Sequence, residues 1–198
     1  ENGYDVAEGV EYAKQLDGHA DIIHCSAGLH GRTKRGNSLR WAPSMYEPDA
    51  AFLKYAAEVK KHVKKSLVSS VGAHSDPKLM EEAIAYGKTD IINIARGLNC
   101  DPDLPNKARA GKDGEIRKCI RCYGCSDALF PTFRIYCVLD PESGRENEFT
   151  RFSLPPEKQR VLVVGGGMGG MEAAITCAKN GHSVLLCEKG PRRPTITC

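Results

Sequence analysis

Two patterns of apolar residues alternate along the first 110 positions of the chain. Short continuous apolar runs are typical of buried strands, whereas apolar residues that recur every three or four positions are typical of helices packed on one face. These patterns predict helices at residues 4–17, 48–63, 76–86 and 104–110, and strands at residues 20–25, 66–71 and 89–95.

Helix-terminating and loop-forming residues separate these segments. Asp76 and Pro77 suit the N-cap and the first turn of a helix, and Gly87 suits the position after its end. The polar stretches 26–45 and 96–103 are predicted to be loops, and the first of them is long enough to be functional.

The alternation of strand and helix predicts a parallel α/β layout. Because the strands are short and apolar on both faces, and unusual residues follow them, the pattern favours the C-terminal part of a (β/α)8 TIM barrel. Barrels of this kind often hold phosphate on the loops after two neighbouring strands. Gly72 would let backbone N–H groups approach a phosphate, and Arg96 would add a fork of donors. Plain turns at Gly72 and Gly97 are an equally weighted alternative.

Four of the nine cysteines are concentrated in one segment. Cys119, Cys122 and Cys125 form C-x2-C-x2-C, and Cys137 follows after eleven further residues. Three neighbouring thiolates with a distant fourth are typical of a [4Fe–4S] cluster. Structural zinc is the alternative, but its usual layout is two separated pairs of ligands. The polar residues between the cysteines predict a loop.

The pattern changes where a strand, a glycine-rich turn, a helix and a second strand follow one another. Gly165, Gly167 and Gly170 fit G-x-G-x-x-G, and Glu188 stands near the expected distance for an acid that binds ribose hydroxyls. The glycines permit a tight turn and the approach of a pyrophosphate to the helix N-terminus. This pattern predicts the start of a Rossmann-like FAD/NAD-binding domain. Its predicted elements are a strand at 160–164, a helix at 171–180 and a strand at 183–187.

The composition narrows the class of protein. A hydrophobic content of 41% and a charged content of 27% are ordinary for a soluble protein. The other five cysteines are irregularly spaced and no signal peptide precedes them, which argues against a disulfide scaffold and predicts a reducing cytoplasm. A net charge of +3 without a basic stripe argues against nucleic-acid binding, and no apolar run is long enough for a membrane span. Since Glu1 opens the chain without a Met, we expect an internal fragment of a longer polypeptide.

The order of a barrel end, a four-cysteine loop and a dinucleotide fingerprint resembles the multidomain flavin oxidoreductases of the old yellow enzyme group. This family includes 2,4-dienoyl-CoA reductase, trimethylamine dehydrogenase, and enoate and bile-acid reductases. The resemblance implies FMN, FAD, NAD(P)H and one [4Fe–4S] cluster as cofactors, with the nicotinamide site beyond Cys198. It divides the chain into the C-terminal part of an FMN-binding barrel (1–114), a cluster loop (115–140), a linker (141–158) and the start of an FAD/NAD(P)-binding domain (159–198).

The resemblance also implies site residues. Gly72 with Ala73, and Ala95 with Arg96, match the two loops that hold the FMN phosphate, although the family often has a basic residue where Ala73 stands. His30 matches an active-site histidine that would assist proton delivery to the substrate carbon or polarise its carbonyl. The alternative for His30 is a loop histidine exposed to water.

Three hypotheses for the reaction follow. The first is reduction of an activated C=C bond in an enoyl-CoA, enoate or enone, with electrons from NAD(P)H. The second is an amine dehydrogenase, suggested by the cysteine spacing, and the third is a non-catalytic electron-transfer module.

We expect a small molecule as the substrate and the rest of the same polypeptide as a partner, and a homo-oligomer is an open alternative. Because its sheet has unpaired strand edges, the fragment alone is expected to be inactive and poorly stable. Cations that could attract an anionic substrate such as an acyl-CoA are Arg32, Lys34, Arg35 and Arg40, and His24 is expected to be packed within its strand.

Overall fold

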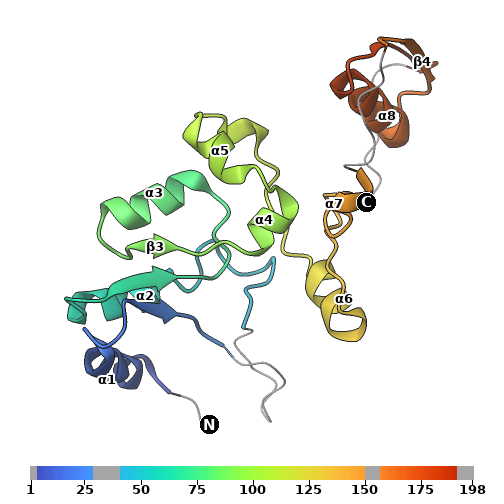
Figure 1. The fold of residues 1–198 in the computed structure, drawn as a ribbon. Helices are drawn as coiled ribbons and strands as arrows, with labels where there is room; N and C mark the ends of the chain where they lie inside the picture. The colour runs from blue at the N-terminus through green and yellow to red at the C-terminus, as the bar shows by residue number, and fades with distance from the viewer. Residues whose placement is uncertain (1–3, 29–40, 150–156, 191–198) are drawn as a thin grey trace. The chain divides into compact units, whose positions relative to one another are not determined.

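The computed structural model describes residues 4–28, 41–149 and 157–190. Two compact units divide after Glu146, and the finer division predicted at residues 114, 140 and 158 stays a prediction. In the first unit the chain forms α1 (Val6–Leu16), β1 (Ile22–Cys25), α2 (Leu53–His62), β2 (Leu67–Ser70), α3 (Pro77–Ala85), β3 (Ile91–Ile92), α4 (Arg96–Cys100), α5 (Leu104–Arg109), the 3₁₀ turn η1 (Asp113–Glu115) and α6 (Gly124–Thr132) (Figure 1). The short helix α7 (Glu146–Phe149) lies at the division, and the second unit forms β4 (Arg160–Val164), α8 (Met168–Lys179) and β5 (Ser183–Cys187).

The sheet of the first unit is parallel, with the strand order β1-β2-β3. Ile22 pairs with Leu67 and Cys25 with Ser70, and the short β3 continues the sheet by pairing Ile92 with Ser70. Helices α2 and α3 form the crossovers between successive strands (Figure 1). The predicted parallel α/β layout is therefore confirmed, and all three strands end at the same edge of the sheet.

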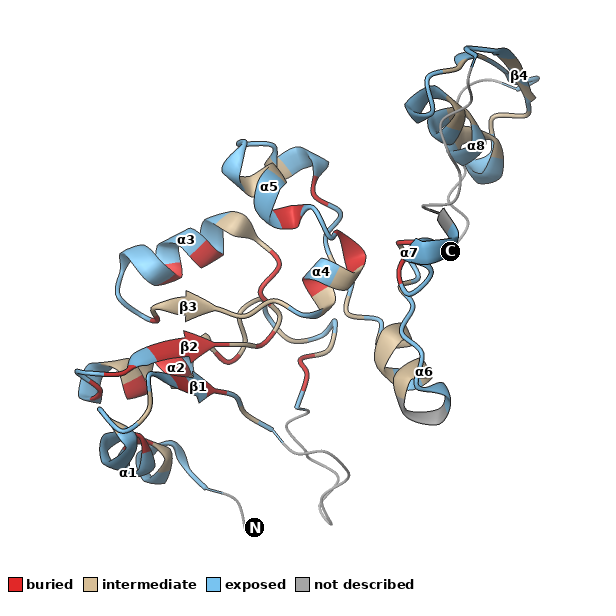
Figure 2. Ribbon diagram, in the orientation of Figure 1, coloured by how far each residue is buried: buried red, intermediate tan, exposed pale blue. Residues whose placement is uncertain are grey.

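Apolar side chains from α1 and α2 pack on one face of this sheet. Asp5 and Glu8 form a capping box that starts α1, in which each side chain accepts a hydrogen bond from the backbone N–H of the other residue, at 2.9 and 3.1 Å. Figure 2 shows the buried positions concentrated in β1, β2 and α2. Full burial of one such large aliphatic side chain contributes about 1.5–3 kcal/mol. The main cluster comprises Val10, Ala13, Ile23, Cys25, Ala56, Val59, Val63 and Val68.

Two aspartates fix where β2 enters the sheet. The Asp17 carboxylate accepts hydrogen bonds from the backbone N–H groups of residues 64–66, at 2.8–2.9 Å. Asp90 accepts from the Val68 N–H and from the Lys60 ammonium, both at 2.7 Å. These contacts hold the start of β2 against its neighbours on both sides, so they set the position at which the strands end.

Several local predictions are wrong. The segment 96–103 was expected to be a loop but contains α4, whose five residues are too few to show a helical period. The second helix begins at Leu53 and not at residue 48, because Ala50 has the left-handed φ of 54° and interrupts the turn. The cysteine segment, expected to be a loop, contains α6.

The second unit is a β-α-β arrangement. Strands β4 and β5 are parallel and pair from Arg160 with Ser183 to Val164 with Cys187. Helix α8 begins at Met168, three residues before the predicted start, so that Gly167 is its N-cap. Both strands carry exposed apolar side chains.

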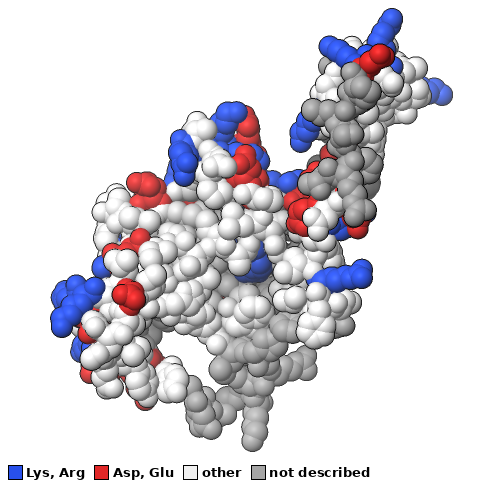
Figure 3. Space-filling view, viewed as in Figure 1, with Lys and Arg blue, Asp and Glu red and all other residues white. Residues whose placement is uncertain are grey.

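Charged side chains lie mainly around the margin of the face of the first unit that Figure 3 shows, and the middle of that face is largely uncharged. Several are paired, among them Lys60 with Asp90 at 2.7 Å and Lys118 with Asp76 at 2.9 Å. Within the described ranges, no helix combines the length and the apolar character that crossing a bilayer requires.

Candidate functional site

A cavity of about 600 Å³ lies at the carboxyl ends of the three parallel strands. This edge is where α/β proteins gather their ligand-binding groups. The walls come from the segment after each strand, from residues 41–43 and from the cysteine segment. The lining residues used below are His24, Gly72, Ala73, His74, Asn93, Ala95, Arg96, Cys119, Arg121 and Cys125.

The loop after β2 turns sharply at Gly72 and Ala73. Both residues have positive φ, 115° and 60°, and a Cβ on Gly72 would stand 2.7 Å from the ring of the buried Phe52. The carbonyl of Ala73 accepts a hydrogen bond of 3.0 Å from the N–H of Ala50. Phe52 and Ala50 therefore hold a glycine-dependent turn against the cavity, where main-chain N–H groups can face an anion.

Arg96 brings a partly unsatisfied guanidinium to the same cavity. Its Nη2 donates to the Pro43 carbonyl at 2.8 Å, but its Nη1 is buried and has no hydrogen-bond partner among the described residues. A buried donor without a partner is costly, at about 1–3 kcal/mol, so such an atom commonly marks a missing ligand. An anionic group in the cavity, such as a phosphate, would satisfy Nη1.

Two histidines line the cavity and differ in burial. The expectation that His24 is packed is wrong, because its side chain is exposed, with Nδ1 3.0 Å from Ser69 Oγ and 3.2 Å from Asn93 Nδ2. His24 lies on the face of β1 that turns away from α1 and α2, which the strand alternation alone does not settle. His74 is buried, its Nε2 lies 3.0 Å from Ser70 Oγ, and burial lowers its pKa.

The backbone of the cysteine segment is left-handed at two positions. Arg121 and Tyr123 both adopt left-handed φ, 57° and 65°, and α6 starts immediately afterwards. The N–H of Arg121 points to the Cys119 sulfur at 3.4 Å. Backbone N–H groups aimed at a cysteine sulfur are a common feature of iron–sulfur sites, where they stabilise the negative charge on the thiolate.

In the fold, the chain around Cys137 lies close to the first three cysteines of the segment. Gly124 is packed so closely against the chain around Cys137 that a Cβ there would stand 3.1 Å from Val138 Cγ1 and 3.3 Å from the Tyr136 hydroxyl. All four predicted ligands line one small pocket, and Cys100, which the sequence did not single out, lines it too. Burial raises the pKa of Cys119, and the thiols of Cys125 and Cys137 act in the same direction, as expected of close neighbours.

The arrangement bears on which metal the pocket fits. A zinc ion needs four sulfurs at about 2.3 Å from one point. Within the described parts of the chain, no group of three or more His, Cys, Asp or Glu side chains surrounds such a point. In an iron–sulfur cube each thiolate binds a different iron, so the sulfurs stand farther apart around a shared pocket. The four cysteines line one pocket, as such a site would require.

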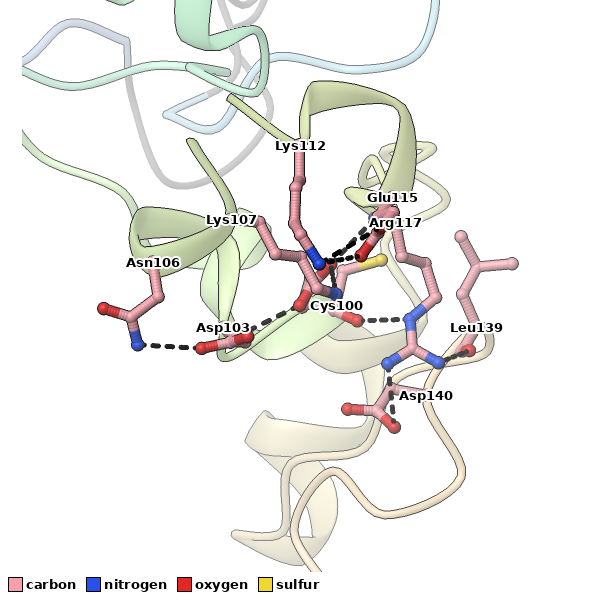
Figure 4. A network of polar contacts seen from close by, with 10 residues as sticks. Cys100, Asp103, Asn106, Lys107, Lys112, Glu115, Arg117, Leu139 and Asp140 are labelled. Atoms are coloured by element: carbon pink, nitrogen blue, oxygen red, sulfur yellow. Dashed lines mark hydrogen bonds and ion pairs between the residues drawn. The ribbon is translucent and has the colours of Figure 1, made fainter. Parts of the chain in front are cut away.

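Arg117 ties the two ends of the cysteine segment to α4 (Figure 4). Its Nε donates to the Cys100 carbonyl at 2.7 Å, its Nη1 donates to the Leu139 carbonyl at 3.1 Å, and its Nη2 lies 3.4 Å from Asp140 Oδ1. The buried Asp101 accepts from the Arg117 N–H at 2.9 Å. Neither Arg117 nor Asp101 was predicted to matter, because no local pattern marks a long-range clamp.

The glycine-rich turn of the second unit has the geometry that the fingerprint requires. Gly165 has φ of 102°, and a Cβ on Gly170 would stand 1.9 Å from the Gly165 carbonyl oxygen. Glu188 accepts hydrogen bonds from the N–H of Gly190 at 2.9 Å and of Gly166 at 2.5 Å, and these two bonds lower its pKa. Gly167 caps the helix whose N–H groups point out of the turn. The Glu188 carboxylate therefore lies beside the glycine-rich turn.

Some predicted residues cannot be placed. His30 and the cations Arg32, Lys34, Arg35 and Arg40 lie outside the described residues. Their suggested roles remain predictions from the sequence. The other predicted site residues lie in three places: the cavity in the first unit, the cysteine pocket beside it, and the glycine-rich turn in the second unit.

Comparisons with known proteins add to this picture. Residues 160–197 match a family described as an FAD binding domain. The chain is 38% identical over 195 residues to the NADH oxidase of Thermoanaerobacter brockii, covering 96% of this chain and 29% of that protein. It is 37% identical over 191 residues to the cinnamate reductase of Clostridium sporogenes, covering 96% and 28%.

A solved structure is also similar. The 6-hydroxypseudooxynicotine amine oxidase from Pseudomonas geniculata N1 has a TM-score of 0.74 and 30% identity, over 94% of this chain and 28% of that one. The chain therefore spans less than a third of the length of the curated relatives and the solved structure that it matches.

Proposed function

Because the chain belongs to the old yellow enzyme-like NADH:flavin oxidoreductase family, we propose that it is part of a flavin- and iron–sulfur-dependent enzyme. In this proposal the enzyme reduces an activated C=C bond of an enoate, enone or enoyl-CoA. The observation that supports it most is the orphaned, buried Nη1 of Arg96, at a cavity that the cysteine pocket adjoins.

The residues of the cavity fit the phosphate of FMN. Gly72 and Ala73 would offer backbone N–H groups from one loop, and Ala95 and Arg96 would close the site from the other. The guanidinium would supply a charge-assisted hydrogen bond from Nη1, the donor that lacks a partner. Residues 1–114 would then be the C-terminal part of a TIM barrel that binds FMN.

The residues of the cysteine pocket fit a [4Fe–4S] cluster. Cys119, Cys122, Cys125 and Cys137 would supply the four thiolates. In the second unit, Gly165, Gly167 and Gly170 would receive the pyrophosphate of FAD, and Glu188 would accept from its ribose hydroxyls. NAD(P)H would be the source of electrons, and FAD, the cluster and FMN would supply the redox chemistry.

His30 is the proposed general acid. It would deliver the proton that completes reduction of the substrate carbon, or hydrogen-bond the carbonyl that activates the double bond. Replacing His30 with Ala in the full-length protein should lower kcat by about 10²–10⁴-fold while leaving flavin and iron content unchanged.

The test uses the full-length protein prepared without oxygen. We expect about four irons and four sulfides per chain, bound FMN and FAD, and oxidation of NAD(P)H that depends on an enoate, enone or enoyl-CoA. One zinc and no sulfide would remove the cluster from the proposal. A full complement of cofactors without turnover on a broad panel would instead favour a non-catalytic electron-transfer module.

An amine dehydrogenase is the second candidate. The similarity to a solved amine oxidase over 94% of the chain favours it, as does the C-x2-C-x2-C spacing. Bleaching of the flavin absorbance by an amine, in the absence of any nicotinamide, would identify this activity. Bleaching of the flavin absorbance by NAD(P)H, followed by its recovery when an enoate is added, would identify the first.

A further inference from the structure

Polar side chains from the three parallel strands meet beside the proposed phosphate loops. His24 comes from β1, Ser69 comes from β2, and Asn93 directly follows β3. His24 pairs with Ser69 in the sheet register, and its Nδ1 lies 3.0 Å from Ser69 Oγ and 3.2 Å from Asn93 Nδ2. His24 and Asn93 line the cavity, and none of the roles described above uses this group of side chains.

The neighbours of His24 determine which ring nitrogen carries the proton. Asn93 Nδ2 lies 3.4 Å from the Ser70 carbonyl oxygen, which can only accept, so this atom belongs to the NH2 group and is not the amide oxygen. The same NH2 group lies beside His24 Nδ1, which must therefore accept, and the imidazole carries its proton on Nε2. The backbone N–H of Asn93 also donates to the Ser70 carbonyl, at 2.8 Å, and so holds Asn93 in place.

The Nε2–H of His24 is available to a ligand of the cavity. The side chain is exposed on the face of β1 that turns away from α1 and α2, and among the described residues its Nε2 has no hydrogen-bond partner. The other side of the ring is held by Asn93 and by Ser69, which is only 2% exposed. His24 is therefore an oriented donor with no acceptor of its own.

The position of His24 relative to the phosphate loops indicates which part of FMN it would meet. Gly72 and Arg96, the proposed phosphate contacts, follow β2 and β3, whereas His24 is on the neighbouring strand β1. Since adjacent strands lie about 4.8 Å apart, a ligand anchored at those loops extends roughly 5–10 Å along the sheet edge to reach His24. In FMN the ribityl chain separates the phosphate from the flavin ring, and the ring carries carbonyl oxygens that accept hydrogen bonds.

We propose that the Nε2–H of His24 donates a hydrogen bond to a ring carbonyl oxygen of FMN, and that Ser69 and Asn93 hold the imidazole in the tautomer that this bond requires. The inference rests on the proposed FMN site. It assigns the two ends of the ligand to different strands, with the phosphate at the loops after β2 and β3 and the ring over β1. His24 thus positions the ring, while Arg96 anchors the phosphate.

Flavin titrations of the full-length apoprotein test this assignment. His24→Leu should weaken the binding of FMN and of riboflavin equally, by about three- to tenfold, because the lost contact is to the ring that both flavins share. His24→Gln keeps an N–H donor and should stay within about twofold of the wild type. His19→Leu is the matched control, because His19 is exposed and precedes β1, at the other end of the strand, and it should leave both affinities unchanged.

Binding of FMN by the wild type is measured first, so that the two proposals fail separately. A wild-type apoprotein that does not bind FMN overturns the FMN site and this inference together. Equal FMN affinities of the wild type and His24→Leu overturn this inference alone, and so does a loss of affinity that is confined to FMN. Equal losses in His24→Leu and His24→Gln would show that the shape of the side chain matters and not its donor, and would also overturn it.

A second measurement needs no variant that lacks the donor. NMR of the full-length protein with isotopically labelled histidine nitrogens reports the tautomer of each ring, and His24→Gln identifies the signals of His24 by their absence. We expect the proton of His24 on Nε2 in the apoprotein, and a shift of the Nε2 signal when riboflavin binds. A proton on Nδ1, or an Nε2 signal that riboflavin leaves unchanged, overturns the inference.

Discussion

The guanidinium carbon of Arg96 lies 5.4 Å from the centroid of the Tyr123 ring, so one side chain contacts both the cavity and the cysteine segment. The two residues also hold neighbouring carbonyls, since Tyr123 donates to Ala42 and Arg96 to Pro43. The positive charge of Arg96 opposes the effect of burial, which raises the pKa of Cys119. Arg96 thus lines both the cavity and the cysteine pocket.

Replacing Arg96 with Ala should therefore affect two cofactors. Loss of a charged hydrogen bond of about 1.5–3 kcal/mol should weaken FMN binding roughly ten- to hundredfold. Affinity for riboflavin, which lacks the phosphate, should change little, and titration of the apoprotein with both flavins measures the difference. Iron release to a chelator should also be faster in this variant.

The matched control for Arg96 is Arg109→Ala, because Arg109 is exposed on α5. It should change neither flavin affinity nor iron release. Equal loss of FMN and riboflavin affinity in Arg96→Ala would contradict a phosphate contact. An unchanged rate of iron release would contradict the coupling through Tyr123.

Replacing Gly72 with Ala should strain the turn after β2. The residue has φ of 115°, and the added Cβ would stand 2.7 Å from the Phe52 ring. Such strain costs about 1–3 kcal/mol, so urea unfolding of the apoprotein should shift to lower concentration and FMN affinity should fall. Gly114→Ala is the control, since a Cβ added there would have no neighbour within 4 Å and the stability should be unchanged. Equal stabilities of the two variants would contradict the close packing of Phe52.

Replacing Arg117 with Lys keeps the positive charge but removes the guanidinium group, whose several N–H donors join α4 to the end of the cysteine segment. We expect a loss of about 1–3 kcal/mol in stability and faster iron release, because the carbonyls of Cys100 and Leu139 lose their donor. Lys112→Ala removes only an exposed ion pair with Glu115 at 3.5 Å, worth about 0–1 kcal/mol, and should release iron at the wild-type rate. Equal iron release by both variants would exclude the clamp.

Local patterns in the sequence predict most of the elements and the ligand segments. Strand and helix periods give the parallel α/β layout, and the spacings of Cys119, Cys122 and Cys125 and of the three glycines are enough by themselves to single out two segments as candidate sites. Each of these patterns lies within a short stretch of the sequence. The resemblance to a flavin oxidoreductase family, based on the order of the motifs, is confirmed by the comparisons.

The sequence alone does not predict contacts between segments that are far apart in the chain. Cys100 precedes the cysteine motif by nineteen residues and looks like any scattered cysteine until α4 and Arg117 place it against Cys137. The need for glycine at position 72 depends on Phe52, twenty residues earlier in the chain. The exposure of His24 likewise depends on which face of β1 the helices α1 and α2 cover.

The stability of the first unit should depend on pH through Asp17. Hydrogen bonds from the N–H groups of Ser66 and Lys64 are the main cause that lowers its pKa from 3.8 to about 2. Because the folded protein holds the carboxylate more strongly than the unfolded chain, this contribution is present above about pH 4 and is lost as the pH falls from 3.8 toward 2. The wild type should therefore unfold at a higher urea concentration than Asp17→Asn at pH 5, and the gap should be clearly smaller at pH 2.5. Asp21→Asn, at an exposed position, serves as the control, and a gap that is the same at both pH values would show that the carboxylate charge of Asp17 is not what holds β2.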